Sequence, residues 1–210
     1  CASFPGERLF ACAAHYDKLE RNAQAIGAQP CETPQQVVDA SDIVVVAVKP
    51  YQVRDVLAPV REALRSKVVV SVAAGVLFDD YEEILAPGTH HLSTIPNTPI
   101  AVGAGVFAVE DAHSLTDEEH ATVCDLFSPI ALIEPVPGHL LSVASGIAGC
   151  GPAFAALFIE SLGDAAVKNG LQRTTAYRLA AQMIRGTGML YLENGEHPGA
   201  MKDAVCSPGG

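Results

Sequence analysis

The sequence of 210 residues has no tryptophan, no block of basic residues and no Cys-x-x-Cys motif. Its 13 Lys and Arg residues are scattered among 24 Asp and Glu residues, which gives a formal net charge of −11. Because a nucleic-acid-binding surface needs clustered cations, no nucleic-acid partner is expected. No apolar run approaches the roughly 20 residues that a membrane-spanning helix needs, so no membrane partner is expected either.

The cysteines are informative through their spacing. All six lie far apart, at Cys1, Cys12, Cys31, Cys124, Cys150 and Cys206. Zinc sites and disulfide frameworks use closely spaced or patterned cysteines, so this spacing favours reduced thiols in a cytoplasmic protein. His90 and His91 are adjacent and have no ligand partner at helical spacing, and we therefore predict no metal site.

The N-terminal two thirds of the chain alternates between strand-like and helix-like patterns. Apolar runs that predict strands occupy residues 9–14, 43–48, 68–72, 92–95 and 131–133. Between them, capping boxes at Thr33–Gln36 and Thr116–Glu119 predict helix starts, and Gly27 predicts a helix end. A helix stripe over residues 53–64 contains Pro59, which should bend or break it. This alternation predicts an α/β fold of right-handed βαβ units on a mostly parallel sheet.

The strand pattern ends near Gly138, so we predict one domain over residues 1–137 and another over residues 138–210. A helix from Pro152 to about Asn169 is apolar on every side over residues 153–159 and must be covered on every side. A second helix over residues 174–193 carries Gly186 and Gly188, which would let another helix approach closely. We therefore expect a helical domain that forms a homodimer or a higher homo-oligomer.

Three of the predicted strands end in unusual turns. Lys49-Pro50 follows the strand over residues 43–48, Ala73-Ala74-Gly75 follows that over 68–72, and the PNTP stretch of residues 96–99 follows that over 92–95. A proline forces the chain out of a sheet, and small residues let the backbone approach a flat ligand. Ligands of parallel sheets bind at these strand ends. One such turn alone would be a simple strand cap, but three in succession favour a dinucleotide site.

Six motifs together resemble the pyrroline-5-carboxylate reductase family, in its order and spacing over essentially the whole chain. They are AVKP at 47–50, SVAAGV at 71–76, IPNTPIAVGAG at 95–105, GCGPA at 149–153, FIESLGDAAVKNGL at 158–171 and KDAVCSPGG at 202–210. The AVKP turn alone is weak, because β-hydroxyacid and 6-phosphogluconate-type dehydrogenases carry similar turns. The combination of PNTP, GxGP and KDxVxSPGG is highly specific.

The resemblance implies the last step of proline biosynthesis, in which an oxidoreductase transfers hydride from NAD(P)H to the C5=N bond of 1-pyrroline-5-carboxylate and forms L-proline. It also implies an N-terminal Rossmann-type domain followed by an all-α dimerisation domain. NADP is the expected cofactor, because residues 13–16 offer no acid to bind the ribose 2′-hydroxyl of NAD. NAD itself stays open. The Ser and Arg with which the family often grips a 2′-phosphate are also absent. His15 and Lys18 are the available candidates.

The resemblance also assigns site residues. The nicotinamide and its ribose are assigned to Ala47, Val48, Lys49, Pro50, Ala73, Ala74 and Gly75, and the carboxamide side to Asn97, Thr98 and Pro99. Ser207, Gly209 and Gly210 would hold the substrate carboxylate where the SPGG turn opens toward a helix. A protonated imine is already electrophilic, so no strongly activated acid or base is expected. Ser207, the candidate catalytic residue, would hydrogen-bond the ring nitrogen, with helix N-capping as its alternative role.

The family's first strand and its Gly-rich GxGxMG turn are missing from this sequence, and Gly210 falls where the family continues. No signal peptide is visible, although the chain does not begin with Met. We expect either part of a longer protein or a truncated form that is inactive alone. Two other functions stay open: another β-hydroxyacid or 6-phosphogluconate-type dehydrogenase, with Lys168 as its candidate proton donor, or a non-catalytic assembly protein descended from the reductase.

Overall fold

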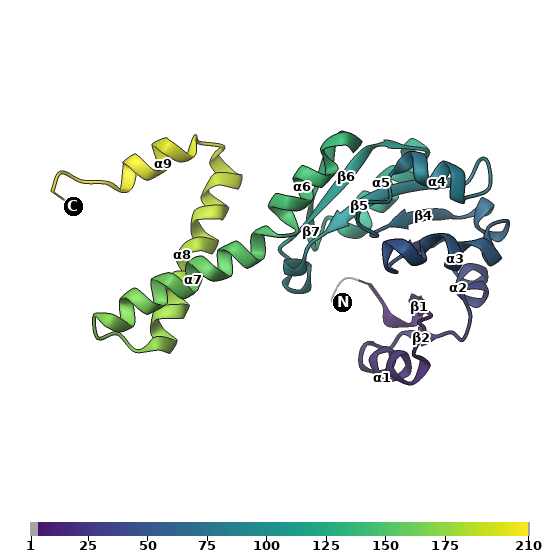
Figure 1. Cartoon of the computed structure of the whole chain (residues 1–210), viewed down its shortest axis with the longest axis horizontal. Coiled ribbons are helices and arrows are strands. Elements are labelled where there is room, and N and C mark those ends of the chain that lie inside the picture. The colour runs from purple at the N-terminus through teal and green to yellow at the C-terminus, as the bar shows by residue number, and fades with distance from the viewer. Residues whose placement is uncertain (1–3, 210) are drawn as a thin grey trace. The chain divides into compact units, whose positions relative to one another are not determined.

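The computed structural model describes residues 4–209, which form two compact units that divide between Cys150 and Gly151 (Figure 1). The first unit holds all of the strands and the second holds only helices within the described residues. The short helix α6 (Leu141–Ala148) contacts strands of the first unit. It therefore belongs to that compact unit, beyond the boundary that we predict at residue 137.

The first unit is built on a five-stranded sheet with the order β3-β4-β5-β6-β7. Its strands are β3 (Ile43–Val46), β4 (Val68–Ser71), β5 (His90–Pro96), β6 (Gly105–His113) and β7 (Ala131–Val136). The β3–β4, β4–β5 and β6–β7 pairs are parallel, whereas β5 and β6 are antiparallel. The predicted mostly parallel sheet is confirmed, but the antiparallel strand β6 was not predicted.

The strands differ in how deeply they are buried. Every residue of β4 is buried, as expected for a central parallel strand with both faces covered. In β3, Val45 keeps 45% of its surface exposed. The continuous apolar run over residues 43–48 is typical of a parallel strand covered on both faces, but β3 is only partly covered because it lies at the edge of the five-stranded sheet.

Local signals placed three helix ends correctly in the first unit. Helix α1 (Tyr16–Ile26) ends at Gly27, which takes a left-handed conformation with φ of 72°. Helix α2 (Pro34–Ala40) and helix α5 (Asp117–Phe127) both begin with the predicted capping boxes. Before α2, the predicted strand over residues 9–14 shortens to β1 (Phe10–Ala11), which pairs in parallel with β2 (Gln29–Pro30) in a separate two-stranded sheet.

Proline breaks the next predicted helix. Helix α3 covers only Val53–Leu57 and continues as the 3-10 turn η3 (Ala58–Val60), which contains Pro59, and then as η4 (Ala63–Ser66). This confirms the expected break, since proline has no N–H for the helical ladder. After β4, helix α4 covers Phe78–Ile84. The remaining 3-10 turns of this unit are η1 (Gly6–Arg8), η2 (Pro50–Gln52), η5 (Thr98–Val102) and η6 (Gly138–Leu140).

The second unit contains α7 (Gly151–Lys168), α8 (Arg173–Asn194) and α9 (Pro198–Val205). The predicted helix from Pro152 is confirmed, and Gly170 ends it with φ of 94°. Close packing of α7 on α8 depends on Gly163, where an added Cβ would overlap the Tyr177 ring. Helix α9 was not predicted.

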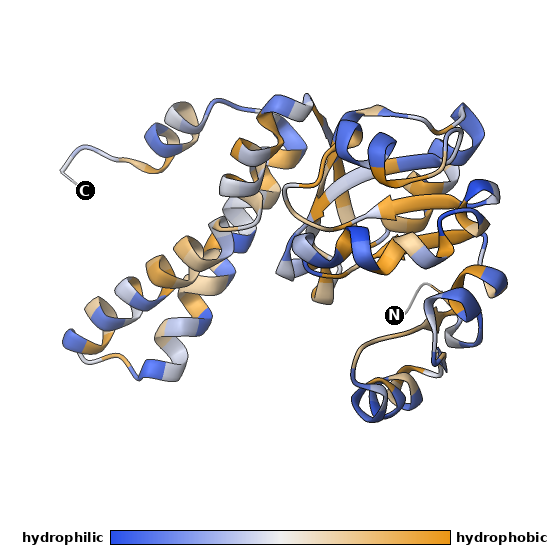
Figure 2. Ribbon diagram, turned by 45° about the vertical axis from the view of Figure 1, so that its right-hand side comes forward, coloured by the Kyte–Doolittle hydropathy of each residue, from blue (hydrophilic) through white to orange (hydrophobic). Residues whose placement is uncertain are grey.

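Much of the apolar surface of α7 is not covered by this chain. Phe154, Leu157 and Phe158 expose 66%, 61% and 53% of their surface, and Figure 2 shows the hydrophobic colour that runs along α7 and α8. An added Cβ at Gly186 or Gly188 would meet no atom within 4 Å among the described residues. A homo-oligomer partner would cover such a surface.

Residues 138–168 also have the length and apolar composition of a membrane-spanning helix. The expectation that no segment reaches this length and composition is therefore wrong. Length and apolar composition do not distinguish a membrane span from a helix that is covered in an oligomer.

Candidate functional site

The first two predicted turns lie side by side at the same edge of the sheet. The β3–β4–β5 register aligns Val46 with Ser71 and Ser71 with Ser93. Immediately beyond β4, the Val72 N–H donates to the Val46 carbonyl over 3.0 Å. The structure therefore brings residues 47–50 next to residues 72–75, as the strand pattern predicts. Ala47, Lys49 and Pro50 are exposed, and Val48 is half-buried.

The turn after β4 is anchored by the buried side chain of Ser71. The Ser71 hydroxyl accepts a 2.6 Å hydrogen bond from the Tyr81 hydroxyl and a 3.1 Å bond from the Ala73 N–H. The Thr94 hydroxyl donates to the Ser71 carbonyl over 2.7 Å. These bonds fix the position at which the chain leaves β4. Burial raises the pKa of Tyr81, more than the bond to Ser71 lowers it, so its hydroxyl is a stable donor.

The tip of this turn is bare backbone. Ala73 is buried, whereas Ala74 and Gly75 are exposed. Gly75 has φ of 81°, a conformation that favours glycine, and an added Cβ there would meet no atom within 4 Å. Because the start of the turn is fixed and its exposed end carries no large side chain, a flat ligand can approach the main chain closely. The sequence predicts this turn, but not Ser71 or Tyr81 as the residues that hold it.

The turn after β5 uses its asparagine differently. The Asn97 side chain accepts a 2.9 Å bond from the Val106 N–H and donates a 3.0 Å bond to the Ala148 carbonyl. Asn97 therefore joins the end of β5 to the start of β6 and to the end of α6. Thr98 is exposed and Pro99 is half-buried in η5. The assignment of Asn97, Thr98 and Pro99 to the carboxamide side stays a prediction.

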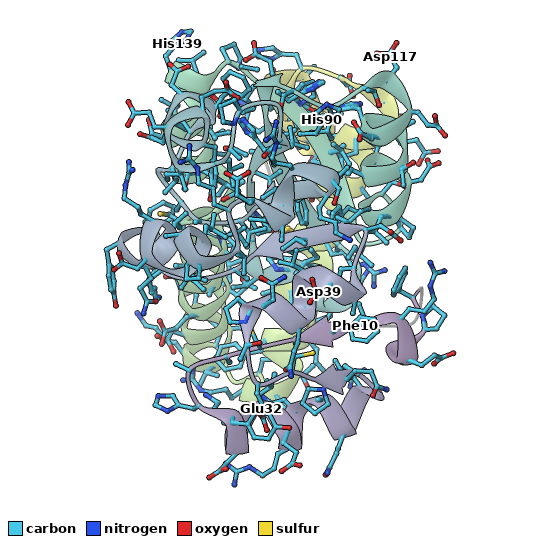
Figure 3. The ribbon with its side chains drawn as sticks, turned by 90° about the vertical axis from the view of Figure 1, so that its right-hand side faces the viewer. Phe10, Glu32, Asp39, His90, Asp117 and His139 are labelled. Atoms are coloured by element: carbon cyan, nitrogen blue, oxygen red, sulfur yellow. The ribbon has the colours of Figure 1, made fainter. Side chains whose placement is uncertain are left out.

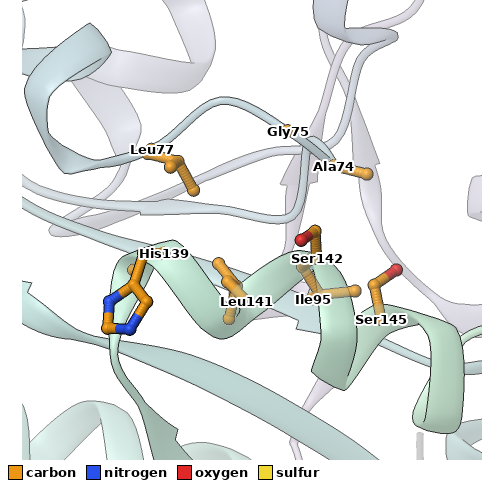
Figure 4. A pocket seen from close by; sticks show the side chains of 9 residues that line it. Ala74, Gly75, Leu77, Ile95, His139, Leu141, Ser142 and Ser145 are labelled. Atoms are coloured by element: carbon orange, nitrogen blue, oxygen red, sulfur yellow. The ribbon is translucent and has the colours of Figure 1, made fainter.

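A cavity of about 390 Å³ opens between the β4 turn and helix α6. Its lining residues are Ala74, Gly75, Leu77, Ile95, Gly138, His139, Leu141, Ser142 and Ser145 (Figure 4). One wall is the Ala74-Gly75 turn, and the other carries an imidazole and two hydroxyls at three-residue spacing on η6 and α6. Sequence reasoning missed this second wall. The spacing of His139, Ser142 and Ser145 is the signal that could have indicated it.

The cavity fits the nicotinamide end of a dinucleotide better than a whole dinucleotide. Ligand pockets begin at about 300 Å³ and are mostly apolar with a few polar groups. Here Leu77, Ile95 and Leu141 supply apolar walls, while Ser142 and Ser145 supply hydroxyls. The residues present are therefore suited to a small planar ring that carries an amide.

The SPGG stretch lies in the second unit, after α9. Helix α9 ends at Val205 and is capped by Cys206, whose N–H donates to the Asp203 carbonyl. Ser207 and Gly209 are exposed, and Gly209 has φ of 78°. Gly210 lies outside the described residues, so the substrate role of these three residues stays a prediction. Just before this stretch, Lys202 and Asp203 form an exposed ion pair with an N–O distance of 3.0 Å.

The adjacent histidines bind separate carboxylates. His90 Nδ1 lies 2.7 Å from Glu119 in α5, and His91 Nε2 lies 2.7 Å from Glu82 in α4. Figure 3 shows His90 beside the helix that begins at Asp117. Within residues 4–209, no three His, Cys, Asp or Glu residues are grouped to hold a metal ion, and the cysteines in that range carry free thiols.

Comparison with known proteins shows which families the two parts of the chain match. Residues 139–210 match the family model for pyrroline-5-carboxylate reductase dimerisation, and residues 5–75 match that for NADP oxidoreductase, coenzyme F420-dependent. The pyrroline-5-carboxylate reductase of Treponema pallidum is 42% identical over 207 residues, which cover 97% of this chain and 78% of that protein. The Escherichia coli enzyme is 37% identical and covers 92% of this chain and 72% of its own length.

Solved structures give the same result. The Plasmodium falciparum pyrroline carboxylate reductase with NADP bound superposes with a TM-score of 0.84 at 30% identity, covering 98% of this chain and 76% of that one. A pyrroline-5-carboxylate reductase from Coxiella burnetii gives a TM-score of 0.87 at 26% identity, covering 100% and 78%. The chain thus belongs to the pyrroline-5-carboxylate reductase family, NAD(P)H-dependent oxidoreductases that reduce 1-pyrroline-5-carboxylate to L-proline.

Proposed function

We propose that the cavity between the β4 turn and α6 holds the nicotinamide end of NADPH during reduction of 1-pyrroline-5-carboxylate. The observation that carries this proposal is the Ser71-anchored turn, because its exposed Ala74 and Gly75 form one wall of the cavity. The neighbouring turn over residues 47–50 supports it from the β3 side. Lys49 and Pro50 in that turn would then face the ribose, as the family resemblance implies.

The chemistry asks the chain mainly to orient and to exclude water. NADPH, when bound, supplies a hydride to C5 of the substrate ring, and the ring nitrogen keeps its proton as the C=N bond becomes a single bond. The apolar residues Leu77, Ile95 and Leu141 would keep water from the reacting carbon. Ser142 and Ser145 would hydrogen-bond the amide or the ring, and neither needs to ionise.

We also propose that Ser207, Gly209 and Gly210 bind the substrate carboxylate. Exposed glycine amides suit an anion, and Gly209 already has the positive φ of an open turn. Ser207 would orient the ring nitrogen through one hydrogen bond.

The dimerisation domain indicates a homo-oligomer, and we infer that the exposed apolar face of α7 forms its interface. A dimer or a higher oligomer built from dimers would both cover this face. We further propose a cytoplasmic location, which free cysteine thiols support.

Ala74→Leu tests the cavity assignment, because the larger side chain fills the space against α6. We expect the dissociation constant for NADP⁺, measured by calorimetry, to rise about tenfold, the equivalent of about 1.4 kcal/mol. Ala25→Leu, an exposed alanine change in α1, is the matched control. Wild-type affinity in Ala74→Leu would overturn the assignment.

A second assay tests the reaction itself. NADPH oxidation by the full-length protein is followed with 1-pyrroline-5-carboxylate and with a panel of β-hydroxyacids and their oxo forms. Turnover of the cyclic imine alone is the expected result. Turnover of a β-hydroxyacid would instead favour the related dehydrogenases, and folded protein without either activity would favour an assembly role.

A further inference from the structure

Glu110 is a buried carboxylate that the reaction described above does not use. It lies in β6 with only 4% of its surface exposed. No Lys, Arg or His among residues 4–209 lies within ion-pair distance of it. Burial of a carboxylate without a cation is unfavourable unless its oxygens serve as hydrogen-bond acceptors. The two oxygens of Glu110 face two different segments of the chain.

The first oxygen holds the start of α4. The Phe78 N–H donates a 2.8 Å hydrogen bond to Glu110 Oε2. Phe78 is the first residue of α4, and it directly follows Leu77, which lines the cavity. The preceding N–H, that of Leu77, is satisfied separately by the Asp80 carboxylate over 2.9 Å. Glu110 is thus the acceptor that ties the β4–α4 segment to the sheet.

The second oxygen lies against the opposite wall of the cavity. In the sheet Glu110 pairs with Val136, and Gly138 follows two residues later at the start of η6. A Cβ at Gly138 would overlap Glu110 Oε1, so the chain can lie on the carboxylate only because this residue is glycine. Gly138 itself lines the cavity, directly before His139.

The Glu110 side chain therefore contacts residues at both walls of the cavity. We propose that Glu110 is a positioning residue for the reductase, whose carboxylate sets the separation between the β4–α4 segment and η6–α6. The inference rests on the proposed function, since it matters to the reaction only if the cavity holds the nicotinamide end of NADPH. Displacement of one wall by about 1 Å can cost a large factor in rate when the reacting atoms must be aligned.

Two variants separate the acceptor from the rest of the side chain. Glu110→Gln keeps an oxygen that can accept the Phe78 N–H, whereas Glu110→Ala removes the acceptor and leaves that N–H unpaired. We expect hydrogen exchange of the Phe78 amide to quicken about tenfold in Glu110→Ala and by less than about twofold in Glu110→Gln. The NADP⁺ dissociation constant should follow the same pattern, with about a tenfold rise in Glu110→Ala only.

Glu82→Ala controls for loss of stability alone. It removes a carboxylate of α4 that bonds to a buried side chain, His91, but Glu82 does not line the cavity. We expect it to lower the melting temperature while NADP⁺ affinity stays at the wild-type value. Gly138→Ala gives a further arm, because its Cβ should weaken NADP⁺ binding in the wild-type background and have little additional effect in Glu110→Ala.

Three results would overturn the positioning role: wild-type NADP⁺ affinity in Glu110→Ala, equal losses in Glu110→Gln and Glu110→Ala, or an equal loss in Glu82→Ala. These results can be distinguished from failure of the cavity assignment itself. In that case Ala74→Leu would also bind NADP⁺ normally, whereas failure of the Glu110 proposal alone leaves the Ala74→Leu defect in place.

Discussion

The Tyr81 hydroxyl donates a 2.6 Å hydrogen bond to the Ser71 hydroxyl, and both side chains are buried. The same serine oxygen accepts from the Ala73 N–H, so one hydroxyl joins α4, the end of β4 and the turn that lines the cavity. The geometry of the proposed nicotinamide wall therefore depends on a bond that lies outside the cavity.

Tyr81→Phe should destabilise the protein by about 1 kcal/mol, the usual net value of one hydrogen bond. Ser71→Ala should cost about 1–3 kcal/mol, because it leaves two buried donors without their acceptor. Denaturant unfolding measures both values. Tyr191→Phe, at a tyrosine that is 46% exposed, is the control and should be neutral. A Tyr81→Phe variant as stable as wild type would contradict the expectation.

Gly163→Ala should destabilise the helical unit although alanine favours helices over glycine by about 1 kcal/mol. The added Cβ would overlap the Tyr177 ring, and the ring cannot move freely because Arg173 bonds to its hydroxyl over 2.8 Å. Thermal unfolding measures the change. Gly186→Ala is the matched control, since its Cβ meets no atom within 4 Å in the part of the chain that the structure describes. A loss of stability in Gly186→Ala would instead indicate a helix from another copy packed against that glycine.

Stability should fall as the pH drops below the ordinary histidine pKa of about 6.5. The His113 ring stacks on His120 at 4.9 Å, and burial, followed by the charge on His120, lowers the pKa of His113. The unfolded chain then binds a proton that the folded chain does not, so the contribution is complete above pH 6.5 and is lost as the pH falls.

Unfolding free energies measured between about pH 8 and about pH 5 test this sign. His113→Phe should show a flatter pH dependence, with a difference of at most about 1.4 kcal/mol per pH unit for one proton. His15→Gln, at an exposed histidine, should leave the curve unchanged. A wild-type slope in His113→Phe would exclude His113 as its source.

Phe158→Glu should dissociate the oligomer, because a charge on the apolar face of α7 cannot be buried against a second copy without a large penalty. Sedimentation velocity measures the change in mass. Ile26→Glu in α1 makes the same kind of change at similar exposure, 51% against 53%, and should leave the assembly intact. An unchanged oligomer in Phe158→Glu would place the interface elsewhere.

The sequence predicted the helix caps, the Pro59 break and the adjacent turns after β3 and β4. It did not predict β6, whose Glu110 and Asp111 interrupt the apolar pattern, or the length of β7, which continues through Pro135. It also missed α6, and with it the His139, Ser142 and Ser145 wall of the cavity. The Asn97 turn was recognised, but its two hydrogen bonds within the first unit were not.

By itself the sequence determined the features that depend on residues close together in the chain, which are helix caps, helix breaks and strand ends. It also determined the order of motifs that identifies the family. Caps, breaks and strand ends act over three or four residues, so they can be seen in the chain before it folds. Only the tertiary structure decided which buried groups share a cavity wall. Glu110 meets Phe78 across 32 residues, and Asn97 meets Ala148 across 51. Such pairs form only when the sheet has set its register, and no local pattern specifies them.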